Sequence, residues 1–161
     1  MVVGVQSRHL RIQSICNRNA FAADICALIN EQGGCALIID YGHLQSRLCD
    51  TLQAVRDHRY WPPLASPGRA DITAHVDFDA LARVALEAGA VAHGPVTQGA
   101  FLEKLGIRVR MEMLCKGKTD AEAEKIRLGA ERIAMPDQMG EIFKVSCFAS
   151  PNLPTPAGFH D

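Results

Sequence analysis

The chain lacks the glycine-rich loops with which many nucleotide-binding proteins hold phosphates. None of its 13 glycines forms a G-x-G pair, and the sequence contains no G-x-x-x-x-G-K pattern. Such loops arrange backbone N–H groups around a phosphate at a helix N-terminus, so a dinucleotide or nucleoside triphosphate site of the usual kind is not expected. A G-x-S-x-G elbow for a nucleophilic serine is also missing.

Long apolar runs and a strong charge of one sign are missing too. No run reaches about 18 apolar residues and no signal-peptide pattern opens the chain, so neither a membrane span nor secretion is predicted. The 17 basic and 18 acidic residues leave a net charge of -1, which provides no basic surface for nucleic acid. With 161 residues, 48% of them hydrophobic, the sequence indicates one soluble, intracellular globular domain.

The six cysteines form no C-x-x-C pair and no paired spacing typical of zinc. Three of them, Cys26, Cys35 and Cys147, have apolar neighbours in the sequence, where a thiol behaves as a small hydrophobic group. We therefore expect buried thiols in a reducing compartment and no metal site.

The first 23 residues contain no acidic residue. Arg8, Arg11 and Arg18 alternate there with serines and apolar residues, which is the composition of an organellar transit peptide. The alternative is a loop or strand of the domain itself, because the segment shows no sustained amphipathic period. Residues 1–20 are therefore left as an N-terminal segment of open role.

The most informative local feature is "CALIID", residues 35–40, which follows a predicted helix that ends at Gly33 and Gly34. A strand that is apolar on both faces is usually covered by helices on both sides, which predicts an inner, parallel strand of an α/β sheet. Ligands bind beyond the carboxyl ends of such strands, so residues 40–43 (Asp-Tyr-Gly-His) are candidates for a ligand site. The alternative is simple strand termination, with Asp40 capping a turn and Gly42 at positive φ.

A long insert, residues 46–69, separates this strand from the next elements, and long connections are often binding lids. Its "TLQAV" is predicted as a strand or a short helix. "ITAHV", residues 72–76, is predicted as a short strand, and Asp71, Thr73 and His75 fall on one side of its alternation. The remaining predicted elements are a helix from Asp77 as N-cap to residue 88, a strand at 89–96, a helix at 98–105 with Thr97 as N-cap, a helix at 119–134, and a closing strand at 141–149.

His75-Val76-Asp77 also matches half of a two-histidine, one-carboxylate iron site, with His93 or His160 as the distal ligand. A three-letter pattern arises easily by chance. Asp77 is explained better by its predicted role as a helix cap. A non-haem iron oxygenase is thus kept as an alternative.

Five separate blocks, "GGCALIIDYGH", "DTLQAVRDHR", "PGRADITAHVDFDALA", "GPVTQGAFLEKLGI" and "MGEIFKV", occur in the order and spacing of a known family. Over about residues 33–159 the sequence resembles the carboxyl-terminal half of the MidA family of S-adenosylmethionine-dependent methyltransferases. The resemblance implies an α/β fold, namely the carboxyl-terminal part of a class I Rossmann-like sheet with an insertion. Residues 21–150 would form this partial domain, with "CALIID" as the fifth strand and "FKVSCFA" as the terminal antiparallel strand, and residues 151–161 a proline-rich tail.

The resemblance also implies an activity. Mitochondrial members methylate an arginine of a respiratory complex I subunit, so the expected partner is a protein substrate, in the mitochondrial matrix of a eukaryote or the cytoplasm of a bacterium. The family's E-x-G-x-G cofactor loop lies in an amino-terminal half that this chain is expected to lack, so S-adenosylmethionine binding would require that half. A non-catalytic, partner-binding remnant of the fold remains an alternative, as does a homo-oligomer formed through an open sheet edge.

Candidate site residues follow from the same resemblance. Methyl transfer to a guanidino nitrogen needs carboxylates that hold the cationic group in place. Asp40 and Asp71 are the predicted catalytic carboxylates. The predicted substrate-binding residues are Tyr41, His43, Thr73 and His75.

Overall fold

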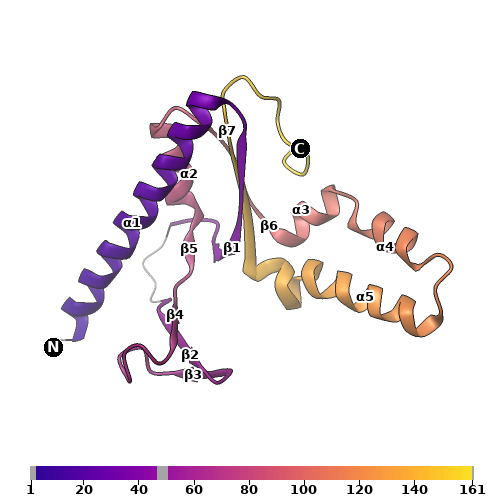
Figure 1. Cartoon of the computed structure of the whole chain (residues 1–161), viewed down its shortest axis with the longest axis horizontal. Coiled ribbons are helices and arrows are strands. Elements are labelled where there is room, and N and C mark those ends of the chain that lie inside the picture. The colour runs from indigo at the N-terminus through magenta and orange to yellow at the C-terminus, as the bar shows by residue number, and fades with distance from the viewer. Residues whose placement is uncertain (1–2, 47–50, 161) are drawn as a thin grey trace.

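A four-stranded sheet forms the centre of the molecule (Figure 1). The computed structural model describes the backbone of residues 3–46 and 51–160, and the side chains from residue 18 onward within those ranges. The strand order is β5-β1-β7-β6, and β7 is antiparallel to both of its neighbours. The strands are β1 (Cys35–His43), β5 (Val76–Asp77), β6 (Val91–Thr97) and β7 (Phe143–Ala149).

Strand β1 has an inner position in the sheet order, as its continuous apolar sequence predicts. The expected parallel pairing is wrong for most of its length, because residues 35–41 pair antiparallel with β7 and only Gly42 and His43 pair parallel with β5. The strand also continues beyond residue 40. Asp40 and Tyr41 are therefore strand residues opposite Lys144 and Phe143, and they do not form a terminating turn.

Helix α1 (Val3–Gln32) is continuous, so the expectation of a loop or strand before residue 21 is wrong. Of its residues, only Gly4 is a strong helix breaker, and a helix can therefore run through a segment that has no apolar period. The end was predicted correctly at the glycine pair. The Gly33 N–H group closes the last turn by donating to the Ile29 carbonyl oxygen at 2.8 Å.

The core lies between one face of the sheet and two helices, α1 and α2 (Phe78–Glu87). Its buried residues include Cys26 and Ile29 from α1, Leu81 and Ala85 from α2, and Phe148 from β7. Helix α2 begins as predicted, because the Asp77 carboxylate accepts a hydrogen bond from the Ala80 N–H group at 2.9 Å. This cap sets the position of the helix directly after β5.

The opposite face of the sheet is covered only in part. The C-terminal segment folds over β6 and β7, where the Phe159 ring lies 6.2 Å from that of His93 and 5.2 Å from that of Phe101. Over β1, Leu37 and Ile39 remain 51% and 46% exposed. The expectation that helices cover both faces of this strand is therefore wrong for the described residues, because α1 and α2 both pack on the same face.

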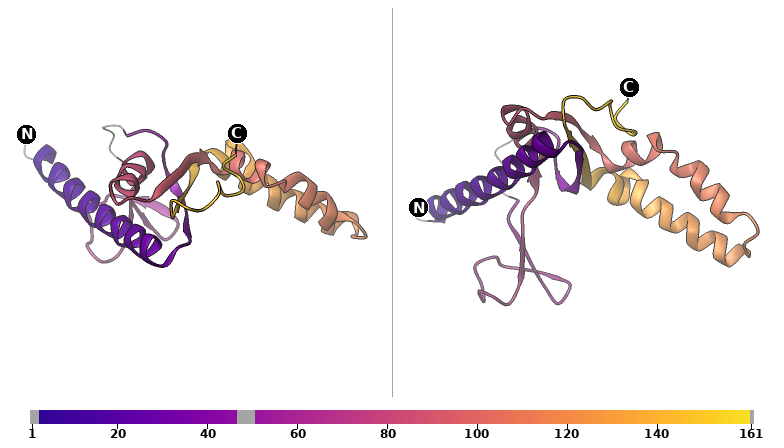
Figure 2. Two further views of the ribbon diagram at one scale, coloured as in Figure 1. Left: turned by 90° about the horizontal axis from the view of Figure 1, so that it is seen from above. Right: turned by 45° about the horizontal axis from the view of Figure 1, so that its top comes forward.

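A helical arm projects from the sheet between β6 and β7 (Figures 1 and 2). It contains α3 (Gln98–Lys104), α4 (Ile107–Cys115), α5 (Asp120–Ala134) and a single π-helical turn, η1 (Pro136–Gly140). Thr97 caps α3 as predicted. Residues 107–114, for which no element was predicted, form most of α4.

A second, three-stranded sheet in the order β3-β2-β4 projects from the other end of the molecule (Figures 1 and 2). Its strands are β2 (Gln53–Arg56), β3 (Arg59–Trp61) and β4 (Asp71–Thr73). Of the two predictions for "TLQAV", a strand or a short helix, the strand is correct, because its residues contribute to β2. "ITAHV", by contrast, is not one strand. Its first part belongs to β4 in the small sheet and its last residue to β5 in the large one. Among the described residues, no helix is long and apolar enough to cross a membrane.

Candidate functional site

Three of the predicted site residues come together at the carboxyl end of β1. The ring centroid of His75 lies 5.0 Å from that of His43 and 5.7 Å from that of Tyr41. Tyr41 also contacts Phe143 of β7, edge to face, at 5.8 Å. These four side chains form an aromatic and imidazole cluster where an α/β sheet usually binds its ligand.

The strand register explains why residues so far apart in sequence meet. Gly42 pairs with Val76 and His43 with Asp77, so His75 enters the sheet immediately beside the end of β1. The His75 N–H group donates to the Thr51 hydroxyl at 3.2 Å, which holds the backbone in this position. The Nδ1 atom of His75 is buried and has no hydrogen-bond partner among the described residues. A buried imidazole nitrogen of this kind is available to an incoming donor or acceptor if the cluster opens.

The two predicted carboxylates are not brought together. Asp40 lies in β1 opposite Lys144, and its carboxylate accepts a hydrogen bond from the Tyr41 N–H group at 2.8 Å. Asp71 and Thr73 belong to β4, in the small sheet that projects away from the central one (Figure 2). The predicted polar row from Asp71 to His75 is therefore divided, because Asp71 and Thr73 belong to the small sheet and His75 lies in the link that leads to β5 of the central sheet.

A polar network beside the cluster was not predicted from the sequence. The Ser46 hydroxyl donates to the Asp77 carboxylate, with both oxygens at 2.8 Å, and accepts a hydrogen bond from the Arg83 guanidinium at 3.0 Å. Burial lowers the pKa of the nearby Arg18 guanidinium, while the Asp77 charge partly opposes that shift. No local pattern marks Ser46, because its contact spans 31 residues and depends on the β1–β5 register.

The iron hypothesis finds no site in the described part of the chain. No group of three or more histidine, cysteine, aspartate or glutamate side chains could hold a metal ion there. The Asp77 carboxylate caps α2 and bonds Ser46, and His93 lies on β6 against Phe159. The geometry therefore gives the iron alternative no support.

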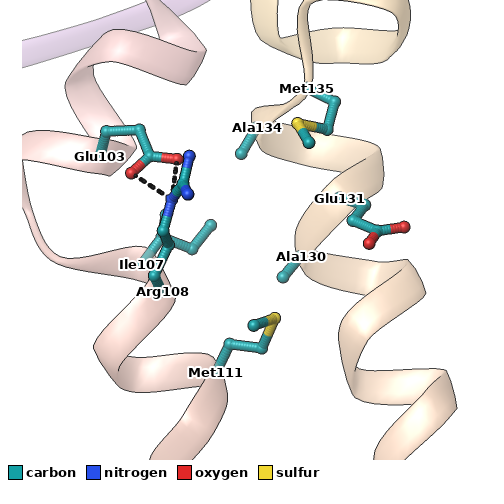
Figure 3. A pocket seen from close by; sticks show the side chains of 8 residues that line it. All are labelled: Glu103, Ile107, Arg108, Met111, Ala130, Glu131, Ala134 and Met135. Atoms are coloured by element: carbon teal, nitrogen blue, oxygen red, sulfur yellow. Dashed lines mark hydrogen bonds and ion pairs between the residues drawn. The ribbon is translucent and has the colours of Figure 1, made fainter.

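One cavity of about 160 Å³ lies in the helical arm, away from the cluster. Figure 3 shows that it opens between Ile107 and Met111 of α4 and the small side chains Ala130 and Ala134 of α5. At one side, Arg108 donates to both carboxylate oxygens of Glu103 at 2.9 Å. The remaining lining residues are Glu131 and Met135. The cavity arises because the small side chains Ala130 and Ala134 of α5 do not fill the space opposite Ile107 and Met111 of α4. None of the predicted site residues lines it.

The sheet and its polar carboxyl end define an α/β fold of the class I methyltransferase type. A sequence model of the family described as "Putative S-adenosyl-L-methionine-dependent methyltransferase" matches residues 12–96, which is more than half of the chain. The chain therefore belongs to this family of S-adenosylmethionine-dependent methyltransferases, as its resemblance to MidA proteins implied.

Relatives carry more specific names. The mitochondrial protein arginine methyltransferase NDUFAF7 of Xenopus tropicalis is 43% identical over 117 residues, which cover 72% of this chain and 27% of that protein. The human protein of the same name is 40% identical over 113 residues, covering 69% and 25%. The chain thus spans about a quarter of the length of these curated relatives.

Solved structures agree with the fold. A crystal structure of a Burkholderia thailandensis protein aligns with a TM-score of 0.71 and 29% identity, covering 89% of this chain and 37% of that one. A second crystal structure from the same organism, bound to S-adenosyl-homocysteine, aligns with a TM-score of 0.69 and 29% identity, covering 89% and 36%. The cofactor of the family is therefore S-adenosylmethionine.

The sequence has no glycine-rich loop, and the end of β1 is filled by the contacting rings of Tyr41, His43 and His75. The phenol and the two imidazoles at this position can each donate or accept a hydrogen bond.

Proposed function

We propose that this chain forms the acceptor side of an S-adenosylmethionine-dependent protein arginine methyltransferase. The observation that carries the proposal is that the family match, residues 12–96, includes Tyr41, His43 and His75, three of the four members of the cluster at the carboxyl end of β1. The names of the relatives support arginine as the acceptor.

The chemistry of arginine favours such a cluster. A guanidinium presents five N–H donors in a plane and is held best by carboxylates and other acceptors. Asp40 supplies a half-buried carboxylate within β1, and His75 supplies a buried Nδ1 atom that lacks a partner within the described residues. Because successive strand residues point to opposite faces, Asp40 projects from the face of β1 opposite to Tyr41 and His43, and these two side chains lie beside His75. Their role would be to orient the acceptor nitrogen and to exclude water around it.

Asp71 and Thr73 join this site only if the small sheet moves. Their strand, β4, is connected to β5 by two residues, Ala74 and His75, so a rotation at this link would carry the small sheet over the cluster. Closure of a lid over a bound substrate is common in enzymes that must exclude water. We therefore assign Asp71 the role of a carboxylate that reaches the acceptor in the closed form.

Cofactor binding is assigned to a complementary part of the fold, in keeping with the quarter length that this chain shares with its relatives. The acceptor proposed here is an arginine of a respiratory complex I subunit. The compartment would be the mitochondrial matrix in a eukaryote, where the named relatives occur, and the cytoplasm in a bacterium.

Calorimetric titration of S-adenosylmethionine tests whether cofactor binding belongs to another part of the fold. One titration uses this chain alone, and the other uses the chain joined to the residues that precede the corresponding segment in a relative. Binding only by the joined protein is the expected result. Micromolar binding by the isolated chain would overturn the assignment of the cofactor to another segment, and binding by neither would favour the partner-binding remnant.

Methylation of an arginine peptide by the joined protein tests the residues. Asp40→Asn and Asp71→Asn should each lower kcat/KM by about 100-fold, as expected for loss of a group that stabilises or positions charge, with S-adenosylmethionine affinity unchanged. Asp57→Asn is the matched control, since this exposed carboxylate lies at the tip between β2 and β3. Loss of activity in the control alone, or in none of the three, would contradict the assignment.

A further inference from the structure

Two cysteines from distant parts of the sequence lie on neighbouring strands of the central sheet. Cys147 of β7 is directly opposite Leu37, and Cys35 of β1 is opposite Ala149. Residues two apart on a strand share a face, so both thiols project from the same face as diagonal neighbours. This is the face on which Leu37 and Ile39 are bare.

The two thiols differ in access and reactivity. Cys35 is exposed, contrary to the burial expected from its apolar neighbours, whereas Cys147 is 1% exposed as expected. Burial, the charge of the adjacent Cys35 and a side-chain hydrogen bond with it together raise the pKa of Cys147 to about 11, and burial is the largest of the three causes. Since the thiolate is the reactive form and Cys147 is both buried and raised in pKa, an oxidant would react first with the exposed Cys35.

We propose that Cys35 and Cys147 form a reversible, redox-sensitive disulfide between β1 and β7, with a low-molecular-weight disulfide such as oxidised glutathione as the oxidant. The Cys35 thiolate attacks one sulfur of the oxidant, forms a mixed disulfide and releases one glutathione thiolate. Cys147 then loses its proton and attacks the Cys35 sulfur, which expels the second glutathione. In sum, two protein thiols are oxidised and one glutathione disulfide is reduced to two glutathione molecules.

The geometry makes this bond labile. Diagonal neighbours in an antiparallel pair have Cα atoms about 7–8 Å apart, whereas an unstrained disulfide requires about 4.4–6.8 Å. The start of β1 must therefore move toward β7 by roughly 1 Å to meet that range. Gly33 and Gly34 precede Cys35, and a Cβ built on either meets nothing within 4 Å, so this end of the strand has room to move. A strained cross-link is easily reduced, which suits a reversible modification.

The test is peptide mapping of the whole chain by tandem mass spectrometry, after equilibration in glutathione buffers that range from reducing to oxidising. The expected product is a 35–147 linked pair that is two hydrogens lighter than the dithiol and disappears in the reducing buffer. Cys115→Ser, a half-buried thiol on the arm, is the matched control and should keep the link. Cys35→Ser should abolish the link and leave Cys147 unmodified.

Cys147→Ser separates the two steps, because Cys35 should then accumulate as a glutathione adduct that cannot resolve. A stable adduct on Cys35 in the unmodified chain would overturn the proposal, and so would a link from Cys35 to any other cysteine. None of these readouts requires methyltransferase activity, so their failure is distinct from failure of the proposed function. Far-ultraviolet circular dichroism of each variant establishes that a lost link does not reflect a lost fold.

Discussion

Gly42 illustrates how one residue controls the approach of two elements. The strand-termination alternative placed it in a turn at positive φ, but it lies inside β1 and is not among the positive-φ residues of the described chain. A Cβ atom at this position would lie 2.2 Å from the Val76 carbonyl oxygen and 2.9 Å from the Phe78 ring. The missing side chain therefore allows β5 and the start of α2 to pack directly against the end of β1.

Gly42→Ala should destabilise the protein by about 3 kcal/mol, at the upper end of the range for overpacking, because a backbone carbonyl cannot move aside as a side chain can. Urea unfolding followed by circular dichroism measures the change. Gly129→Ala is the matched control, since position 129 is in α5 and a Cβ there meets nothing within 4 Å. This control should stabilise the protein by about 0.5–1 kcal/mol. Equal effects from the two substitutions would disprove the steric argument.

Helix α5 shows how a single element is stabilised at its start. The Glu122 N–H group donates to the Thr119 hydroxyl at 3.4 Å, and the Glu122 carboxylate accepts from the Thr119 N–H group at 3.0 Å, which completes a capping box. The hydrogen bonds from the Thr119 backbone and side chain lower the pKa of Glu122 below its ordinary value.

A lowered carboxylate pKa gives this cap a defined pH dependence. Its contribution is fully present above the ordinary glutamate pKa and is lost as pH falls through the lower pKa of the folded state. The protection of the amides in the first turn of α5, measured as hydrogen exchange relative to the intrinsic rate at each pH, should therefore fall as the medium is acidified through that range. Thr119→Val removes the hydroxyl and should raise the Glu122 pKa, measured by NMR titration. An unchanged titration curve in this variant would show that the hydroxyl has no part in the shift.

Helices that begin with a capping residue and continue with an apolar period were predicted from the sequence, and a helix without these two features was not. Asp77 and Thr97 mark helix starts by a short polar side chain before an apolar period, and both caps form. Helix α4 has no cap hydrogen bond from a side chain and no buried residue in the chain as described, so neither periodicity nor capping could identify it. The division of "ITAHV" depends on which strands lie beside it, and that information is not local.

The same distinction holds for the site. Tyr41 and His43 were predicted from their place after an apolar run, and the structure brings His75 to them. The separation of Asp71 from Asp40 was not predictable, because alternation shows which residues share one face only while a strand remains in one sheet. Ser46 was missed for the related reason that its partner is supplied by the β1–β5 register.

At the scale of the whole molecule, the bare face of β1 is the main feature that the sequence did not reveal. A run of apolar residues predicts that both faces of the strand are covered, yet Leu37 and Ile39 are exposed. On the side of β1 that faces β5, only Gly42 and His43 are paired, and residues 35–41 have no neighbouring strand there in the described ranges. Exposed apolar strands with an open edge associate with other chains. The isolated chain should therefore self-associate as its concentration rises.

Ile39→Lys should weaken this association by at least about tenfold in dissociation constant, since a charge on an edge strand opposes pairing. Sedimentation velocity over a range of concentrations measures it. Because Ile39 is exposed, stability should change by less than about 0.5 kcal/mol. Phe148→Ala, on the covered face, is the contrasting control and should cost about 3–5 kcal/mol of stability. A monomeric wild-type chain at high concentration would refute the expectation.

The pairing of β1 with β7 also constrains the order in which the molecule can assemble. The Gly34 N–H group is bonded to the Ser150 hydroxyl across 116 positions of the chain, near one end of the longest strand pair in the sheet. Contacts of such long range form slowly, because the loop-closure entropy must be overcome before they are made. During synthesis, β1 would leave the ribosome well before its antiparallel partner exists, so the centre of the sheet must be completed last. The apolar strand thus has to remain unpaired through most of translation, and an unpaired apolar strand is exposed to aggregation during that time.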